Sequence, residues 1–262
     1  MPRVVALYRY PVKGFTPEHC PSLTVLPEGR AAGDRVLAFR FANAPVADDQ
    51  WCRKYEGIVL ANTPGLARLS TQFDHRELRL KIALGSQVLA DEKLDDAGRG
   101  RLVAALTAYV LSLREHPLRN HPDRQPLKLI GDGVTPRYQD NEAGQVTLHS
   151  RETITSAAVA LRDPKLSEHR FRSNIAIEGI EAWAEQSWIG RSIRIGGVEF
   201  DVVKSKVRCL ATHANPVTGE RDLQVMQQLM RSFAQKEPVL GVGMLTRGAG
   251  GEIRVGDEVT LI

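Results

Sequence analysis

The sequence predicts a strand-rich α+β protein with two parts, an N-terminal β-barrel-like domain and a second β-barrel domain that includes a few helices. Short segments of alternating apolar residues recur along the chain, each bounded by Gly, Pro, Asp or Asn. This spacing is typical of a barrel or sandwich rather than of repeated βαβ units. With 262 residues, 42% of them hydrophobic and 25% charged, the chain can bury a full core and fold as a water-soluble protein.

The first part is expected to open with strands. Apolar residues alternate over residues 4–10, and a second apolar run at 23–26 precedes a turn. Similar runs predict strands at 35–41, 57–61 and 78–84.

The clearest helix is expected at 98–115, where apolar side chains recur every three or four residues. Asp95 and Asp96 can cap its N-terminus, and Pro117 ends it.

A stretch rich in Pro and Gly follows at 120–144 and suits a long ordered loop between two halves. We therefore predict an N-terminal domain at residues 1–118 and a second domain at residues 119–262.

The second domain is expected to begin with a strand that ends at His149 and a helix from Ser150 towards Leu161. A strand at 171–177 and a helical turn around Trp183 follow.

Two hairpins are expected at 193–200 and 253–261, with Gly-Gly and Gly-Asp turns. Between them an amphipathic helix is expected at 223–233, and its Met and Phe side chains are assigned to the core.

Charge and cysteine content exclude several classes of function. The chain carries 35 Lys and Arg against 31 Asp and Glu, with no basic run, so nucleic acid is not an expected partner. Three widely spaced cysteines fit neither a disulfide framework nor a pair of zinc ligands, which indicates a reducing compartment. No apolar stretch approaches the about 18 residues of a membrane span, and no targeting segment is recognised, so we expect a cytoplasmic protein.

Known nucleotide and hydrolase motifs are also missing. The sequence has no P-loop, no GxGxxG after a strand, no HExxH and no GxSxG. Nucleotide-dependent and serine-hydrolase functions therefore have no support.

Cys209 is a candidate reactive residue because it ends a long alternating run and follows three basic residues, Lys204, Lys206 and Arg208. Positive neighbours favour the thiolate, which attacks electrophiles or binds metal. In an unbroken strand the basic side chains would face away from the thiol, so this role requires a bulge. The commoner alternative is a buried structural cysteine. A Cys-His pair with His213 is a minor alternative, since no partner acid is marked.

Arg172 and Asn174 are candidate anion ligands. In a strand at 171–177 they would project side by side, and a guanidinium beside an amide suits a phosphate. The alternative is a solvated Arg beside a turn-forming Asn. Lys13 and Arg35, at strand ends, are ambiguous by themselves.

Several short motifs occur along the chain in a fixed order. They are Tyr-Pro-Val-Lys within 7–14, Arg-Phe-Arg-Ser-Asn-Ile at 170–175, Trp-Ala-Glu-Gln-Ser-Trp at 183–188, Val-Arg-Cys at 207–209 with Asn-Pro-Val-Thr-Gly at 215–219, and Ile-Arg-Val-Gly-Asp at 253–257. Together they resemble the MOSC family, named for the C-terminal domain of molybdenum cofactor sulfurases and preceded here by its usual N-terminal β-barrel domain. The chain is similar to the amidoxime-reducing branch rather than to the large sulfurases, whose aminotransferase-like domain it does not show.

The resemblance implies a pterin-molybdenum cofactor bound between the two domains, with Cys209 as the molybdenum ligand and catalytic residue. A soft thiolate is a reasonable ligand for such a centre. The residues that it implies for binding the pterin or its phosphate are Lys13, Arg35, Arg172, Asn174 and Arg208.

Three positions depart from the family pattern. Gly14 replaces a serine, Ser173 replaces a proline, and Lys206 stands where many relatives have a second cysteine. The first two changes remove a donor and some rigidity, whereas Lys206 adds attraction for an anionic cofactor.

The first hypothesis for function is a molybdenum-dependent oxidoreductase that reduces N-oxygenated small molecules. Its electrons would come from a separate flavin, haem or iron-sulfur protein, because no such domain is recognised in the chain. The first alternative is a non-catalytic carrier that bears a persulfide on Cys209 for sulfur or cofactor delivery. The second is an anion-binding interaction module without metal.

Overall fold

The computed structural model describes all 262 residues, and its largest element is an eight-stranded sheet. In spatial order its strands are β15 (Val259–Leu261), β11 (Ser192–Ile195), β12 (Val198–Val207), β13 (Val239–Arg247), β9 (Val146–Ser150), β10 (Ile175–Glu178), β1 (Arg3–Arg9) and β2 (Glu18–Cys20). Only β9 and β10 pair in parallel; the other neighbours are antiparallel.

The strand-rich α+β fold is confirmed, but the barrel expected in the second domain is not closed, since only a single bridge, Arg3 to Glu258, links β1 to the residues before β15. The edge strands β15 and β2 do not pair with each other. After β2 the chain leaves the sheet as β3 (Ser22–Val25), which pairs with β14 (Gly251–Arg254) in a separate ribbon. Leu23, Val25 and Ile253 of this ribbon are buried in the same core as the large sheet, so the ribbon covers its apolar face.

The first half contains two small sheets rather than a barrel. A three-stranded sheet is formed by β5 (Leu69–Asp74), β6 (Arg79–Leu84) and β7 (Gln87–Lys93), and β4 (Ala38–Arg40) pairs with β8 (Lys128–Ile130). The predicted strand at 57–61 is a single bridge at Gly57 followed by turns.

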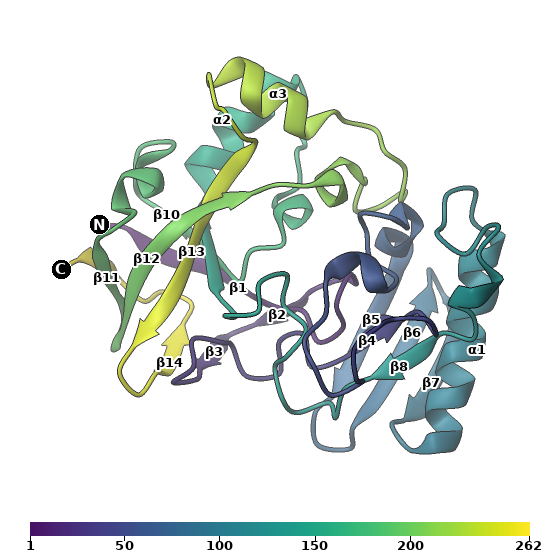
Figure 1. The fold of residues 1–262 in the computed structure, drawn as a ribbon. Helices are drawn as coiled ribbons and strands as arrows, with labels where there is room; N and C mark the ends of the chain where they lie inside the picture. Colours follow the sequence, from purple (N-terminus) through teal and green to yellow (C-terminus); the bar gives the residue numbers. More distant parts are fainter.

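Helix α1 (Asp96–Ser112) packs beside these small sheets (Figure 1). Asp95 caps it by accepting a hydrogen bond from Gly98 N at 2.7 Å, as predicted, whereas Asp96 lies inside the first turn. The helix ends before Pro117, because the chain turns extended at Leu113.

Helix α2 (Arg151–Leu161) is capped by Ser150, as predicted. Helix α3 (Val225–Ser232) buries Val225 and Leu229, but Met226 and Met230, which were assigned to the core, are only partly buried. Six short 3-10 helices complete the chain: η1 (Lys54–Glu56), η2 (Pro64–Arg68), η3 (Pro122–Arg124), η4 (Glu168–Phe171), η5 (Ala184–Trp188) and η6 (Leu210–His213). No helix is long and apolar enough to cross a membrane.

One predicted hairpin is confirmed and the other is wrong. Strands β11 and β12 pair across Gly196 and Gly197, as expected. In contrast, β14 pairs with β3 and β15 pairs with β11, so residues 253–261 are not a hairpin. The apolar alternation marks both strands, but it does not specify their partners.

The molecule has two main hydrophobic cores. One is formed by residues between 12 and 129, and the other combines Val4, Leu7, Leu23 and Val25 with residues from the second half. Figure 1 shows β1 running among the strands of that half. The predicted boundary at 118/119 stays a prediction, but Val4, Leu7, Leu23 and Val25 pack with the C-terminal part, whereas Val12 and Phe15 belong to the first core.

Candidate functional site

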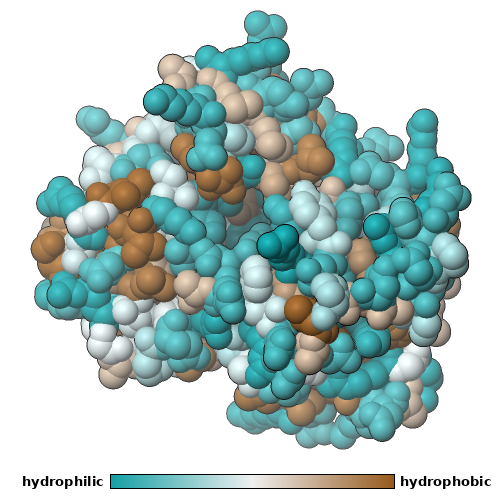
Figure 2. All heavy atoms as spheres, in the orientation of Figure 1, coloured by the Kyte–Doolittle hydropathy of each residue, from teal (hydrophilic) through white to brown (hydrophobic).

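A polar pocket lies where the two halves meet. It encloses about 160 Å³, and hydrophilic side chains predominate around this junction on the face drawn in Figure 2. Its cations are Arg35, Lys54, Arg170, Arg172, Lys206 and Arg208. The same pocket contains the thiol of Cys209 and the carboxylate of Asp140.

A second cavity of about 50 Å³ adjoins the first. The two share Arg35, Lys54, Asp140, Arg172 and Cys209, and the smaller one adds Lys13. The structure therefore brings together five of the six site residues predicted from the sequence, Lys13, Arg35, Arg172, Arg208 and Cys209. Asn174 lines neither cavity.

Asn174 is buried, with 1% of its surface exposed, and its side chain links three neighbouring segments by hydrogen bonds. Its Oδ1 accepts hydrogen bonds from Thr147 N at 3.3 Å and Oγ1 at 3.1 Å. Its Nδ2 donates to Tyr8 O and Asp34 Oδ1, both at 3.2 Å. The amide is thus fully used within the protein, and it positions Asp34 rather than a ligand.

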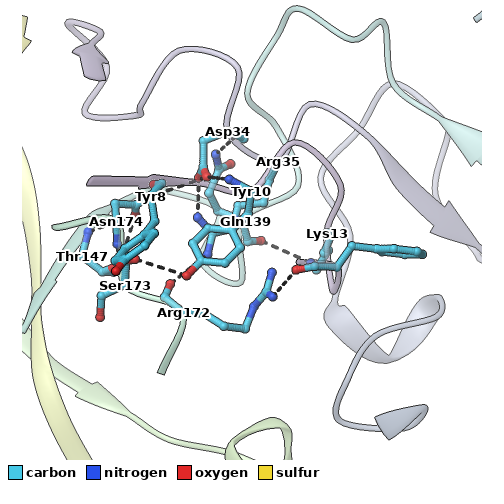
Figure 3. Close-up of polar contacts among 11 residues, drawn as sticks. Tyr8, Tyr10, Lys13, Asp34, Arg35, Gln139, Thr147, Arg172, Ser173 and Asn174 are labelled. Carbon is cyan, nitrogen blue, oxygen red and sulfur yellow. Dashed lines mark hydrogen bonds and ion pairs between the residues drawn. The ribbon is translucent and has the colours of Figure 1, made fainter. Parts of the chain in front are cut away.

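The predicted pairing of Arg172 and Asn174 on one strand face is wrong. Residues 168–171 form η4, and Arg172 adopts a left-handed backbone with φ of 52° before β10 begins at Ile175. The reversal at Arg172 sends its side chain into the pocket while Asn174 points into the core (Figure 3).

Arg35 and Arg172 both lie against the ring of Tyr10 (Figure 3). Their guanidinium carbons are 4.6 and 4.3 Å from the ring centroid, which is cation–π geometry. Asp34 forms an ion pair with Arg35 and accepts a hydrogen bond from Tyr10 N at 2.8 Å. Arg172 donates to Phe15 O. Like Arg172, Arg35 has a left-handed backbone, with φ of 51°, and such strain outside glycine is concentrated at functional sites.

Cys209 reaches the pocket through irregularities in β12. The register with β13 shifts between Val202 and Lys204 and again between Ser205 and Val207, which supplies the bulges that the sequence argument required. Cys209 then precedes η6 as its N-cap residue. As a result Lys206, Arg208 and Cys209 line the same pocket.

Arg208 is buried and fixed, because its Nε donates to Leu240 O at 2.8 Å and its Nη1 donates to Phe171 O at 2.6 Å.

His213, the possible partner of Cys209 in a nucleophile pair, is engaged with helix α3 instead. Its Nε2 accepts a hydrogen bond from Met226 N at 3.3 Å, at the start of α3. A Cys-His nucleophile pair is therefore not formed.

Positive charge exceeds negative charge in the pocket. Its ion pairs join Lys13 to Asp140, Arg35 to Asp34 and Arg170 to Asp222. The cations left without a carboxylate partner are Lys54, Arg172, Lys206 and Arg208.

The pKa values reflect this excess of positive charge. Burial, together with the charge of Arg208, lowers the pKa of Lys206 to about 8. Burial, together with the charge of Arg35, lowers the pKa of Arg172 to about 10. For Asp140 the surrounding charges stabilise the ionised form. Desolvation acts to raise the pKa of Asp140, but the positive charges of Lys13, Arg35, Lys54 and Arg172 lower it below its ordinary value. An anionic ligand would relieve the repulsion among the cations.

Two amide oxygens in the pocket lack hydrogen-bond donors. They are Oε1 of Gln139 and Oε1 of Gln145, and both are buried. Gln139 Nε2 donates to Asp34 O at 3.1 Å, which leaves its oxygen as the free atom. These oxygens can accept hydrogen bonds from N–H groups of a ligand.

Sequence reasoning missed Lys54, Gln139, Asp140 and Gln145. Lys54 begins the short helix η1 and the other three lie in loops, none of them in a recognisable motif, and tertiary packing alone brings them to Cys209. Only the length and the Pro and Gly content of the loop at 120–144 could have drawn attention to part of this set.

Glu168 anchors η4, the segment that leads into Arg172. Its carboxylate accepts hydrogen bonds from Tyr8 Oη, His149 Nε2 at 3.3 Å and Arg151 at 3.2 Å. Desolvation acts to raise the pKa of Glu168, but hydrogen bonds from His149, Arg151 and Tyr8 hold it well below its usual range.

We expect Glu168→Gln to lower the free energy of unfolding at pH 7 by about 2 kcal/mol, since charge-assisted hydrogen bonds are lost. A carboxyl whose pKa is depressed by folding stabilises the protein above about pH 4.3, and that contribution is lost as the pH falls. The variant should therefore lose less stability than the wild type between about pH 5 and pH 3 in urea titrations. The exposed Glu181→Gln is the control; equal acid sensitivity of wild type and Glu168→Gln would contradict the assignment.

Comparison with known proteins gives a family match for the second half of the chain. Residues 135–260 match the model of the MOSC domain. The chain is 31% identical to mitochondrial amidoxime-reducing component 1 of Homo sapiens over 110 residues, which are 38% of this chain and 32% of that protein. It is 29% identical to mitochondrial amidoxime reducing component 2 of Rattus norvegicus over 149 residues, 53% of this chain and 37% of that protein.

These matches span about a third of the length of the two mitochondrial proteins. Among solved structures, the YUAD protein from Bacillus subtilis aligns with 99% of this chain and 94% of its own, at 12% identity and a TM-score of 0.43. The matched region includes Arg172, Arg208 and Cys209 of the pocket. Residues 135–260 of this chain are a MOSC domain.

Proposed function

We propose that this protein binds a pterin-molybdenum cofactor in the pocket between its halves and reduces N-oxygenated small molecules with electrons from a separate protein. Three observations support the proposal. They are the MOSC domain, the similarity to proteins named amidoxime-reducing components, and the convergence of Cys209 with the unpaired cations of the pocket. The last of these carries the argument, because it comes from this chain's own residues.

The donor set of the pocket fits this cofactor. A pterin that carries a phosphate presents both N–H donors and negative charge. The buried oxygens of Gln139 and Gln145 lack donors, and Arg172 and Arg208 lack carboxylate partners. Each of these unmet requirements matches a group that the cofactor would bring.

The size of the pocket adds one condition. Both cavities are smaller than the roughly 300 Å³ at which ligand pockets usually begin, so some lining side chains have to move for a whole cofactor to enter. The Asp140 side chain has room to move, because 65% of it is exposed. The cofactor's phosphate would then replace the Asp140 carboxylate as counter-ion to Lys13, Arg35 and Arg172.

The residues of this chain would have distinct roles. Cys209 Sγ would be the thiolate ligand of molybdenum, and the positive charges of Lys54 and Arg208 line the same pocket. Arg35 and Arg172, held on the Tyr10 ring, would bind the anionic end of the cofactor. The cofactor would supply the two-electron chemistry that converts an N–OH group, with two protons, into N–H and water.

A direct test is the reduction of benzamidoxime to benzamidine by protein from cells that make the cofactor, with reduced methyl viologen as the electron source. We expect two dye molecules to be oxidised for each benzamidine formed. Protein that carries the cofactor in full amount and reduces no N-hydroxylated substrate would overturn the reductase assignment. Transfer of sulfur from Cys209 to an acceptor under those conditions would instead support the carrier function.

A further inference from the structure

Lys54 and Lys206 differ from the other cations of the pocket. The guanidinium groups there are fixed by the protein, since Arg35 pairs with Asp34, Arg172 donates to Phe15 O, and Arg208 donates to Leu240 O. Neither lysine pairs with a carboxylate or donates to a backbone carbonyl, and the ammonium group of Lys54 lies beside the thiol of Cys209. Their ammonium groups are therefore the free donors of the site.

The two lysines come from the two halves of the molecule. Lys54 lies in η1 of the first half, where desolvation would lower its pKa, but the charges of Cys209 and Asp140 raise it. It lines both cavities together with Cys209. Lys206 lies on the bulged part of β12 in the second half and lines the larger cavity. The thiol thus opens into a space with an unpaired ammonium group from each half.

We propose that the site selects substrates that carry a negative charge, such as a carboxylate, beside the group to be reduced, and that Lys54 Nζ and Lys206 Nζ bind that charge. This inference rests on the proposed function and names its substrate class. Fixed guanidinium groups suit a ligand that stays bound, such as a cofactor, because their geometry is already set. Flexible ammonium groups with unused donors suit a ligand that enters and leaves.

The first test uses the full chain made without cofactor, so that Cys209 is a free thiol. Iodoacetate and iodoacetamide both alkylate the thiolate by displacing iodide, but only iodoacetate carries a negative charge. The ratio of their rates at Cys209 cancels any change in the fraction of thiolate and reports the attraction for an anion. Mass spectrometry of the Cys209 peptide, in a Cys20→Ser background, separates this site from the buried Cys52.

We expect Lys54→Met and Lys206→Met each to lower the iodoacetate to iodoacetamide ratio by about fivefold, since each removes one nearby charge. Lys204→Met is the matched control, because Lys204 lies on the same strand but is exposed and outside the pocket. An unchanged ratio in both pocket variants would overturn the inference, whether or not the protein is a reductase.

The second test uses the cofactor-loaded enzyme and compares benzamidoxime with its 4-carboxy derivative. We expect kcat/KM to favour the carboxylate in the wild type, and the preference to fall in both pocket variants while bound pterin stays constant. Equal use of both substrates would overturn the inference and leave the reductase function standing.

Loss of pterin in the variants would also overturn the inference, because the lysines would then bind the cofactor. Failure to reduce either compound would overturn the proposed function, and the alkylation ratio then decides whether the anion site exists.

Discussion

Cys209→Ser is expected to lower the rate of N-hydroxyl reduction by about 100-fold or more while bound pterin stays near the wild-type amount. Serine keeps a small polar side chain but replaces a soft thiolate by a hard, protonated hydroxyl, so the metal loses its sulfur ligand. The pterin contacts proposed for Arg35, Arg172, Gln139 and Gln145 are untouched. Activity and pterin content are measured on the same preparation.

The fold should tolerate this change, because Cys209 is only half-buried and its side chain makes no capping hydrogen bond. Cys20→Ser, also at a half-buried cysteine, controls for a general effect of losing a thiol. The carrier function predicts loss of transferable sulfur without a change in reduction, and a structural cysteine predicts a lower Tm with function kept. A Cys209→Ser protein that reduces substrate at the wild-type rate would refute the ligand assignment.

Arg172→Ala is expected to weaken cofactor binding by about tenfold to 100-fold, the value of one charge-assisted hydrogen bond in a buried site. The Tm should stay close to that of the wild type. Burial and the charge of Arg35 depress the pKa of Arg172 to about 10, so the folded state disfavours this cation and its removal relieves repulsion. Pterin retained after dilution and the Tm are measured together.

Arg162→Ala provides the matched control, because Arg162 also has a left-handed backbone, with φ of 54°, but lies at the end of α2 away from the pocket. Alanine keeps the Cβ at both positions, so backbone strain is unchanged in each variant. A large fall in Tm that accompanies the loss of pterin would show that Arg172 supports the fold instead of the ligand. Equal pterin retention in both variants would remove Arg172 from the site.

Local features of the fold were predictable from the sequence, and partners distant in the chain were not. The Gly196-Gly197 hairpin and the caps at Asp95 and Ser150 depend on residues a few positions apart, so their patterns carry the information. The strands at 251–254 and 259–261 also alternate, but they pair with strands remote in sequence. The alternation of apolar residues does not specify the partner strand. For the same reason the sequence did not show which strands lie at the edges of the large sheet.

In the candidate site, too, features set by residues close in sequence were predictable, and features set by distant residues were not. Cys209 was a candidate because of its place at the end of a strand and its basic neighbours, and the resemblance to the MOSC family made it the favoured ligand; the required bulges in β12 exist. Asn174 was misplaced because Arg172 adopts a left-handed conformation that reverses the chain, and no residue type there signals it. Lys54 reaches the pocket from the short helix η1 and Gln139 from a loop, and their positions depend on how the two halves pack.

The most direct test of the proposed cofactor is the molybdenum and pterin content per chain in protein purified from cells that make the cofactor. Binding in the pocket between the halves predicts close to one molybdenum and one pterin for each chain, with both lowered in Arg172→Ala and unchanged in Arg162→Ala. Folded protein that contains neither molybdenum nor pterin, in the wild type as in Arg172→Ala, would contradict the account.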